Sequence, residues 1–103
     1  MKLIINGDNL DINSKIKDLA KKHVGQKIDK HLNNFDQGLR VGWLKIKKGV
    51  RWGFEASLKI SLPKKEIFAK SKEKELLKTL IAVRNQVIKQ IKEYKGKINS
   101  KRN

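Results

Sequence analysis

Residues 73–97 read EKELLKTLIAVRNQVIKQIKEYKGK, and this stretch is the longest helical pattern in the chain. Its apolar residues recur at the i, i+3, i+4 spacing that lines one side of a helix. They are Leu76, Leu77, Leu80, Ile81, Val83, Val87, Ile88, Ile91 and Tyr94. We therefore predict a long helix that buries one side.

The same helix is predicted to display positive charge beside its buried side. An advance of about 100° per residue separates two polar flanks. The cationic flank consists of Lys74, Lys78, Asn85, Lys89 and Lys92. The opposite flank consists of Glu75, Thr79, Gln86 and Glu93. A charged flank is often only a solvated surface, so whether this flank binds a partner must be judged from the rest of the chain.

The composition indicates one small domain with a polyanionic partner. The chain has 103 residues, with 26 Lys and Arg against 10 Asp and Glu, and a net charge of +16. Solubility alone asks for a net charge of about 2 to 8 in a small domain. The surplus positive charges repel one another in the folded state, so a negatively charged partner is the simplest explanation for them.

Several classes of protein are excluded by the same composition. The chain has no cysteine, so it forms no disulfide or thiolate metal site. The apolar run at residues 3–5 is too short for a signal peptide, and no stretch is long enough to cross a membrane. We therefore expect a cytoplasmic protein without a membrane partner.

The remaining segments predict one helix and four strands. Residues 2–6 form a short apolar run before a turn, and residues 14–32 follow the helical period after a possible cap at Asn13-Ser14. Further strands are predicted at residues 39–47, 52–62 and 66–72.

We therefore predict the α+β order β-α-β-β-β-α, with a four-stranded mixed sheet and two helices packed on one face. The first two strands should be parallel and the last three should form an antiparallel meander. Clean alternation in residues 52–62 leaves the other sheet face polar. Residues 1–96 form the domain, and residues 97–103 are expected to be a basic, frayed tail.

The aromatic residues of the strands divide into two groups. Trp52 shares the apolar parity of its strand and is expected in the core. Trp43 and Phe68 have ambiguous parity, so they are either core residues or platforms on which bases stack. A bulge at Gly42 would reconcile the two halves of the strand at residues 39–47.

The polar residues do not form a convincing catalytic site. His23 and His31 fall within the apolar arc of the first helix, where a packed or interface histidine is the simpler interpretation. Asp8, Asn9 and Asp11 are too closely spaced for a calcium loop and favour a turn. We therefore predict no enzyme activity, no cofactor, no metal and no small-molecule substrate.

The charge is better explained by binding to phosphates. The first helix also carries lysines outside its apolar side: Lys15, Lys17, Lys21, Lys22, Lys27 and Lys30. Two basic helices packed side by side would form one cationic surface. Such a surface binds folded RNA through its backbone and shape, with strong salt dependence.

Three stretches resemble the short form of the ribosome hibernation-promoting factors and ribosome-associated inhibitors. They are LIINGDNLDI at residues 3–12, Phe68-Ala69 before the last helix, and Gln90-Ile91 followed by Lys95 and Lys97. The resemblance implies the fold predicted above. It also implies a translation inhibitor that binds the small ribosomal subunit and its RNA, where messenger and transfer RNA pass, when growth stops.

The resemblance also implies a set of RNA-binding residues and a monomer off the ribosome. The expected RNA-binding residues are Lys21, Lys22, Lys27, Lys30, Lys74, Lys78, Lys89, Lys92, Lys95 and Lys97. His23, Gln86 and Glu93 depart from the family by standing where basic residues are usual. Because the resemblance is to the short form, we expect no extra C-terminal domain of the long forms and no pairing of ribosomes through such a domain.

Two alternatives stay open at the level of sequence. A double-stranded-RNA-binding domain would use the helix, three strands and helix from Ser14 onward, with Lys70, Lys72 and Lys74 near its last helix. A structural ribosomal protein would be a permanent component and not a reversible inhibitor.

Overall fold

Four strands form a single mixed sheet in the computed structural model, which describes residues 1–32, 41–62 and 65–100, with side chains as far as residue 96. The strands are β1 (Lys2–Asp8), β2 (Val41–Lys48), β3 (Phe54–Leu62) and β4 (Lys65–Glu73), adjacent in that order. β1 is parallel to β2, whereas β2, β3 and β4 form an antiparallel meander. This arrangement confirms the predicted sheet.

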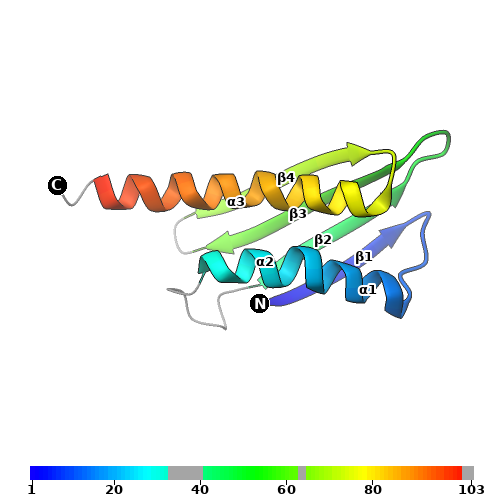
Figure 1. Ribbon diagram of the computed structural model, residues 1–103, viewed down its shortest axis with the longest axis horizontal. Helices are drawn as coiled ribbons and strands as arrows, with labels where there is room; N and C mark the ends of the chain where they lie inside the picture. The colour runs from blue at the N-terminus through cyan, green and yellow to red at the C-terminus, as the bar shows by residue number, and fades with distance from the viewer. Residues whose placement is uncertain (33–40, 63–64, 101–103) are drawn as a thin grey trace.

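Two helical segments cover one face of this sheet (Figure 1). The first helical segment, residues 14–32, consists of α1 (Ser14–Ala20), a π turn (Lys21–Gly25), α2 (Gln26–Asp29) and a 3-10 turn (Lys30–Leu32). The second is α3 (Leu76–Ser100). The predicted order of elements is therefore confirmed, and the π turn is the feature that the helical period did not predict.

Local interactions explain where the first helix begins and how a hairpin turn connects β2 to β3. Asn13 caps the helix, because its Oδ1 accepts a hydrogen bond from the Ile16 N–H at 2.9 Å. In the hairpin, the Gly49 N–H donates to the Gly53 carbonyl at 2.9 Å. Gly53 has φ +64, a left-handed conformation that glycine adopts without steric cost.

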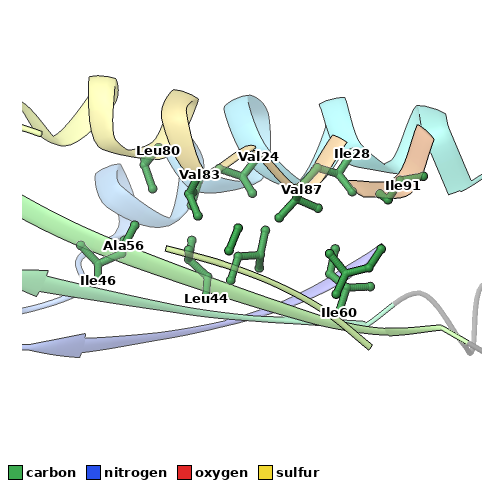
Figure 2. Close-up of a cluster of buried hydrophobic side chains, with 14 of the residues drawn as sticks. Val24, Ile28, Leu44, Ile46, Ala56, Ile60, Leu80, Val83, Val87 and Ile91 are labelled. Carbon is green, nitrogen blue, oxygen red and sulfur yellow. The ribbon is translucent and has the colours of Figure 1, made fainter. Parts of the chain in front are cut away.

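The core lies between the helices and the sheet, as Figure 2 shows. Its labelled residues are Leu80, Val83, Val87 and Ile91 of α3, Val24 and Ile28 of the first helical segment, and Leu44, Ile46, Ala56 and Ile60 of the sheet. All of these side chains are buried. Because a large apolar side chain contributes about 1.5 to 3 kcal/mol when fully buried, this layer is the main source of stability.

The predicted bulge at Gly42 is wrong. Gly42 pairs in regular register with Leu3 of β1 and Ile60 of β3. It lies on the inner face, where a Cβ would overlap Met1 Cε and lie 3.2 Å from Leu3 Cδ1. Since β2 alternates without interruption, Trp43 lies on the open face, away from the helices.

The expectation that Trp52 packs in the core is also wrong. β3 begins only at Phe54, so Trp52 belongs to the hairpin and its side chain is 50% exposed. Its ring lies below Lys72, whose Nζ is 5.6 Å from the ring centroid. A parity that holds inside the strand therefore does not extend into the turn.

The ends of several predicted elements differ slightly from the structure or lie outside it. The last helix begins at Leu76, not at residue 73, and continues to Ser100. In Figure 1 its last turns project beyond the strands. The predicted start of β2 at residues 39–40 lies outside the described residues, as do residues 101–103. The frayed tail thus stays a prediction.

Candidate nucleic-acid interface

The two flanks of α3 face different surroundings. Gln86 Nε2 donates to Ser71 Oγ at 2.6 Å, and Gln90 Nε2 donates to the Phe68 carbonyl at 2.8 Å. These bonds hold one flank of α3 over β4. The other flank displays the exposed lysines Lys78, Lys89 and Lys92. The uncharged Gln86 therefore has a structural partner where the family resemblance leads us to expect a basic residue.

The first helical segment packs beside α3 and is joined to it by a side chain that sequence analysis did not single out. Arg84 Nη1 donates to the backbone carbonyl of His23 at 3.3 Å. Arg84 also donates to Asn85 Oδ1 from Nε and Nη2, each at 3.2 Å. His23 lies in the π turn, so this turn is the point at which the two helical segments are connected.

Positive charge converges where the two helical segments end. In Figure 1 both segments run in the same direction, so their C-terminal ends lie at the same side of the molecule. There His31 lies close enough to Lys92 and Lys95 to be affected by their charges. Burial, and then these two ammonium groups, hold the pKa of His31 below its ordinary value of 6.5.

Most of the predicted RNA-binding lysines are accessible. The exposed ones are Lys21, Lys22, Lys27, Lys30, Lys74, Lys78, Lys89 and Lys92. Lys95 is half-buried, and the side chain of Lys97 lies outside the described ones. Lys78 forms an ion pair with Glu75 at 3.8 Å, which is weak because both side chains are exposed.

Two of these lysines lie apart from the α3 flank. Lys74 precedes α3, in the connection from β4. Lys21 lines a hollow with Met1, Leu3 and Asp29, on the side of the first helical segment that faces β1. We call the surface formed by the other predicted RNA-binding lysines with described side chains the two-helix surface. Its lysines are Lys22, Lys27, Lys30, Lys78, Lys89, Lys92 and Lys95.

Sequence reasoning also missed the cationic character of the open sheet face. Outward-facing positions of β2 and β4 carry Lys45, Lys47, Lys70 and Lys72. Their alternation with buried residues is visible in the sequence, but the uncertain parity around Gly42 hid it in β2. Correct assignment of that glycine to the inner face would have placed Lys45 and Lys47 on the open face.

The described residues contain neither a metal cluster nor a helix able to cross a membrane. Within residues 1–32, 41–62 and 65–100, no three His, Asp or Glu side chains are grouped so as to hold a metal ion. No helix in the described part of the chain is long and apolar enough to cross a membrane.

Comparison with known proteins identifies the family. The model of the family described as "Sigma 54 modulation protein / S30EA ribosomal protein" matches residues 3–99. The chain belongs to the S30EA family. This confirms the resemblance to ribosome hibernation factors that was drawn from the sequence. Curated protein sequences include no significant match to the chain.

Solved structures support the S30EA fold. The N-terminal domain of Protein Y from Thermus thermophilus is similar, with a TM-score of 0.74 and 17% identity, over 91% of this chain and 99% of that one. A ribosomal subunit interface protein from Coxiella burnetii has a TM-score of 0.70 and 16% identity, over 93% of this chain and 99% of that one. At these identities the similarity establishes the fold alone.

Proposed function

We propose that this S30EA protein binds the small ribosomal subunit and inhibits translation by occupying the channel for messenger and transfer RNA. The observation that carries the proposal is the family match over residues 3–99. A protein with a similar fold is described as a ribosomal subunit interface protein, which is consistent with a ribosomal partner. The proposed partner places the protein in the cytoplasm.

The two-helix surface is the proposed contact with ribosomal RNA. Arg84 joins the two helical segments at His23, and Lys92 and Lys95 bring two ammonium groups near His31. Such a surface neutralises phosphates without reading bases, because lysine is a point charge on a flexible stem. A net charge of +16 further accelerates the encounter with a polyanion.

The proposed mechanism is competition and contains no catalytic step. A monomer that fills the channel excludes messenger and transfer RNA, so inhibition should be stoichiometric with ribosomes and should need no cofactor. Loading messenger and initiator transfer RNA first should weaken inhibition. Silencing of all ribosomes by substoichiometric protein, or altered ribosomal RNA after a high-salt wash, would instead reveal an enzyme.

The contact surface is tested by sedimentation with purified small subunits. The variant Lys78→Gln/Lys89→Gln/Lys92→Gln should bind far less, because three cations are lost from one surface. Its free energy of unfolding should stay within about 1 kcal/mol of the unmodified protein, since surface substitutions usually have small effects.

A charge-matched control distinguishes the loss of the two-helix surface from a general loss of positive charge. Lys2→Gln/Lys48→Gln/Lys65→Gln removes three exposed lysines at strand ends and should retain most of the binding. If both variants lose binding equally, the two-helix surface is not the contact. If the first variant binds subunits as the unmodified protein does, the proposed surface is wrong.

A further inference from the structure

The open face of the sheet carries large aromatic side chains that the core does not explain. The strand register places Ile4, Trp43, Lys59 and Phe68 side by side in one row across the four strands. Trp43 is 40% exposed and Phe68 is 56% exposed. Exposed rings of this size on an otherwise polar face are a common sign of a binding site.

Charged neighbours accompany the two rings. Lys59 lies between them, with its Nζ 5.9 Å from the centroid of the Trp43 ring. The same Nζ forms an ion pair with Glu66 at 2.8 Å. Since adjacent strands are about 4.8 Å apart, the backbones at Trp43 and Phe68 are separated by roughly 10 Å, with Lys59 on the strand between them.

The neighbouring rows supply positive charge. The register aligns Lys45 with Lys70, across Ser57, and Lys47 with Lys72, across Glu55. A hollow of about 290 Å³ lies among them, lined by Lys45, Lys47, Glu55, Ser57, Phe68 and Lys70, with Asp8 of β1 at its edge. The lysines of the two rows outnumber their acids, so phosphates can be neutralised beside the aromatic row.

Two acids of this face, Glu55 and Glu66, form ion pairs with lysines. Lys70 Nζ lies 2.9 Å from Glu55 Oε1. This hydrogen bond, with the charges of Lys70, Lys47 and Lys72, holds the pKa of Glu55 below its ordinary value. Glu66 is similarly paired with Lys59. Anions approaching the lysine rows therefore meet two carboxylates whose charge is compensated, and Asp8 is the further carboxylate that lines the hollow.

Rings flanked by lysines are the arrangement used to bind single-stranded nucleic acid. Bases stack on aromatic rings while cationic side chains follow the phosphates. RNA-recognition motifs likewise use exposed aromatic residues of a four-stranded sheet to stack two or three bases. A duplex does not fit this chemistry, because its bases are already stacked on one another. An acidic protein would satisfy the lysines but would leave the separated rings without equivalent partners.

We propose that the open sheet face binds single-stranded RNA, with bases stacked on Trp43 and Phe68 and phosphates held by Lys45 and Lys47. This site lies on the face opposite the helices and goes beyond the proposed function. The protein would then have two RNA-binding faces: one that follows folded RNA through its phosphates and one that accepts unpaired bases.

Tryptophan fluorescence tests the stacking directly. The chain has two tryptophans, so Trp52→Leu leaves Trp43 as its single reporter and Trp43→Leu leaves Trp52. Titration with a ten-nucleotide oligouridylate should quench Trp43 strongly and Trp52 weakly. An RNA duplex of the same length should leave Trp43 nearly unquenched. Equal quenching of both tryptophans, or of Trp43 by the duplex, would overturn the proposal.

Affinity for the same labelled oligouridylate provides the second test. Trp43→Leu and Phe68→Leu should each weaken binding about tenfold, in keeping with the cost of losing one stacked base. Trp43→Phe, which retains a ring, should recover most of the affinity, and Trp52→Leu should bind within about twofold of the unmodified protein. Unchanged binding by the Trp43→Leu/Phe68→Leu variant, with an unaltered melting temperature, would refute stacking.

Comparison of variants distinguishes the contributions of the two proposed RNA-binding faces. Lys78→Gln/Lys89→Gln/Lys92→Gln should keep the quenching of Trp43 by oligouridylate even where sedimentation with subunits is lost. If this helix variant abolishes the quenching, the open face is not an independent site. If subunits are not bound by any variant but the quenching persists, the proposed function fails and the open-face site stands.

Discussion

Arg84 Nη1 donates to the backbone carbonyl of His23, 3.3 Å away, and so joins the middle of α3 to the π turn. The Gln26 N–H bonds to the Lys21 carbonyl, five residues earlier, as expected of a π turn. The two helical segments that carry the proposed ribosome contact are therefore linked through a local irregularity in one of them.

Arg84→Met should lower the free energy of unfolding by about 1 to 2 kcal/mol, because it removes a partly buried hydrogen bond with a charged donor. Urea denaturation measures this change. Asn85→Ala removes only the exposed neighbour of Arg84 and should stay within about 0.5 kcal/mol. Equal stability of the two variants would show that the link between the helices contributes little.

Two glycine-to-alanine substitutions should have opposite effects on stability. Gly53 has φ +64, and a Cβ there would overlap the Glu73 carbonyl oxygen, so Gly53→Ala should cost more than about 1 kcal/mol. Gly96 lies within α3, and a Cβ added there would have nothing within 4 Å, so Gly96→Ala should stabilise by up to about 1 kcal/mol. Thermal unfolding of both variants checks the two signs; a neutral Gly53→Ala would contradict the hairpin geometry.

Binding to small subunits should depend strongly on salt. If about six phosphates are neutralised, affinity should fall on the order of a thousandfold between roughly 50 and 200 mM monovalent salt. The triple glutamine variant of Lys78, Lys89 and Lys92 should show a shallower slope, because fewer counterions are released. A nearly flat titration of the unmodified protein would contradict a phosphate-dominated contact.

His31 should make the protein less stable in mild acid. Its folded-state pKa is held below 6.5 by burial and by Lys92 and Lys95, so the unfolded chain binds the proton more readily. The resulting loss is absent above the unfolded pKa and grows as the pH falls from about 6.5 towards the lower folded pKa. His31→Gln should therefore flatten the pH dependence of the free energy of unfolding between about pH 7.5 and 5. Identical slopes for the two proteins would refute this assignment.

The amino-acid sequence by itself determined the number and order of the strands and of the two helical segments, but not the π and 3-10 turns within the first segment. The apolar spacing that ends at Tyr94 predicted α3, and the alternation over residues 52–62 predicted β3, which begins at Phe54, because each period is set by the geometry of its own segment. Asn13 marked the helix start for the same reason, since a cap needs only a backbone N–H a few residues away.

The tertiary structure alone decided which faces these elements present and what they bring together. Trp43 lies on the open face because pairing with β1 and β3 directs Gly42 inward, against Met1 and Leu3. Strand parity is ambiguous from a segment alone, and only pairing with neighbouring strands sets it. The approach of His31 to Lys92 likewise joins residues far apart in the chain, and it depends on how two helices pack on one sheet.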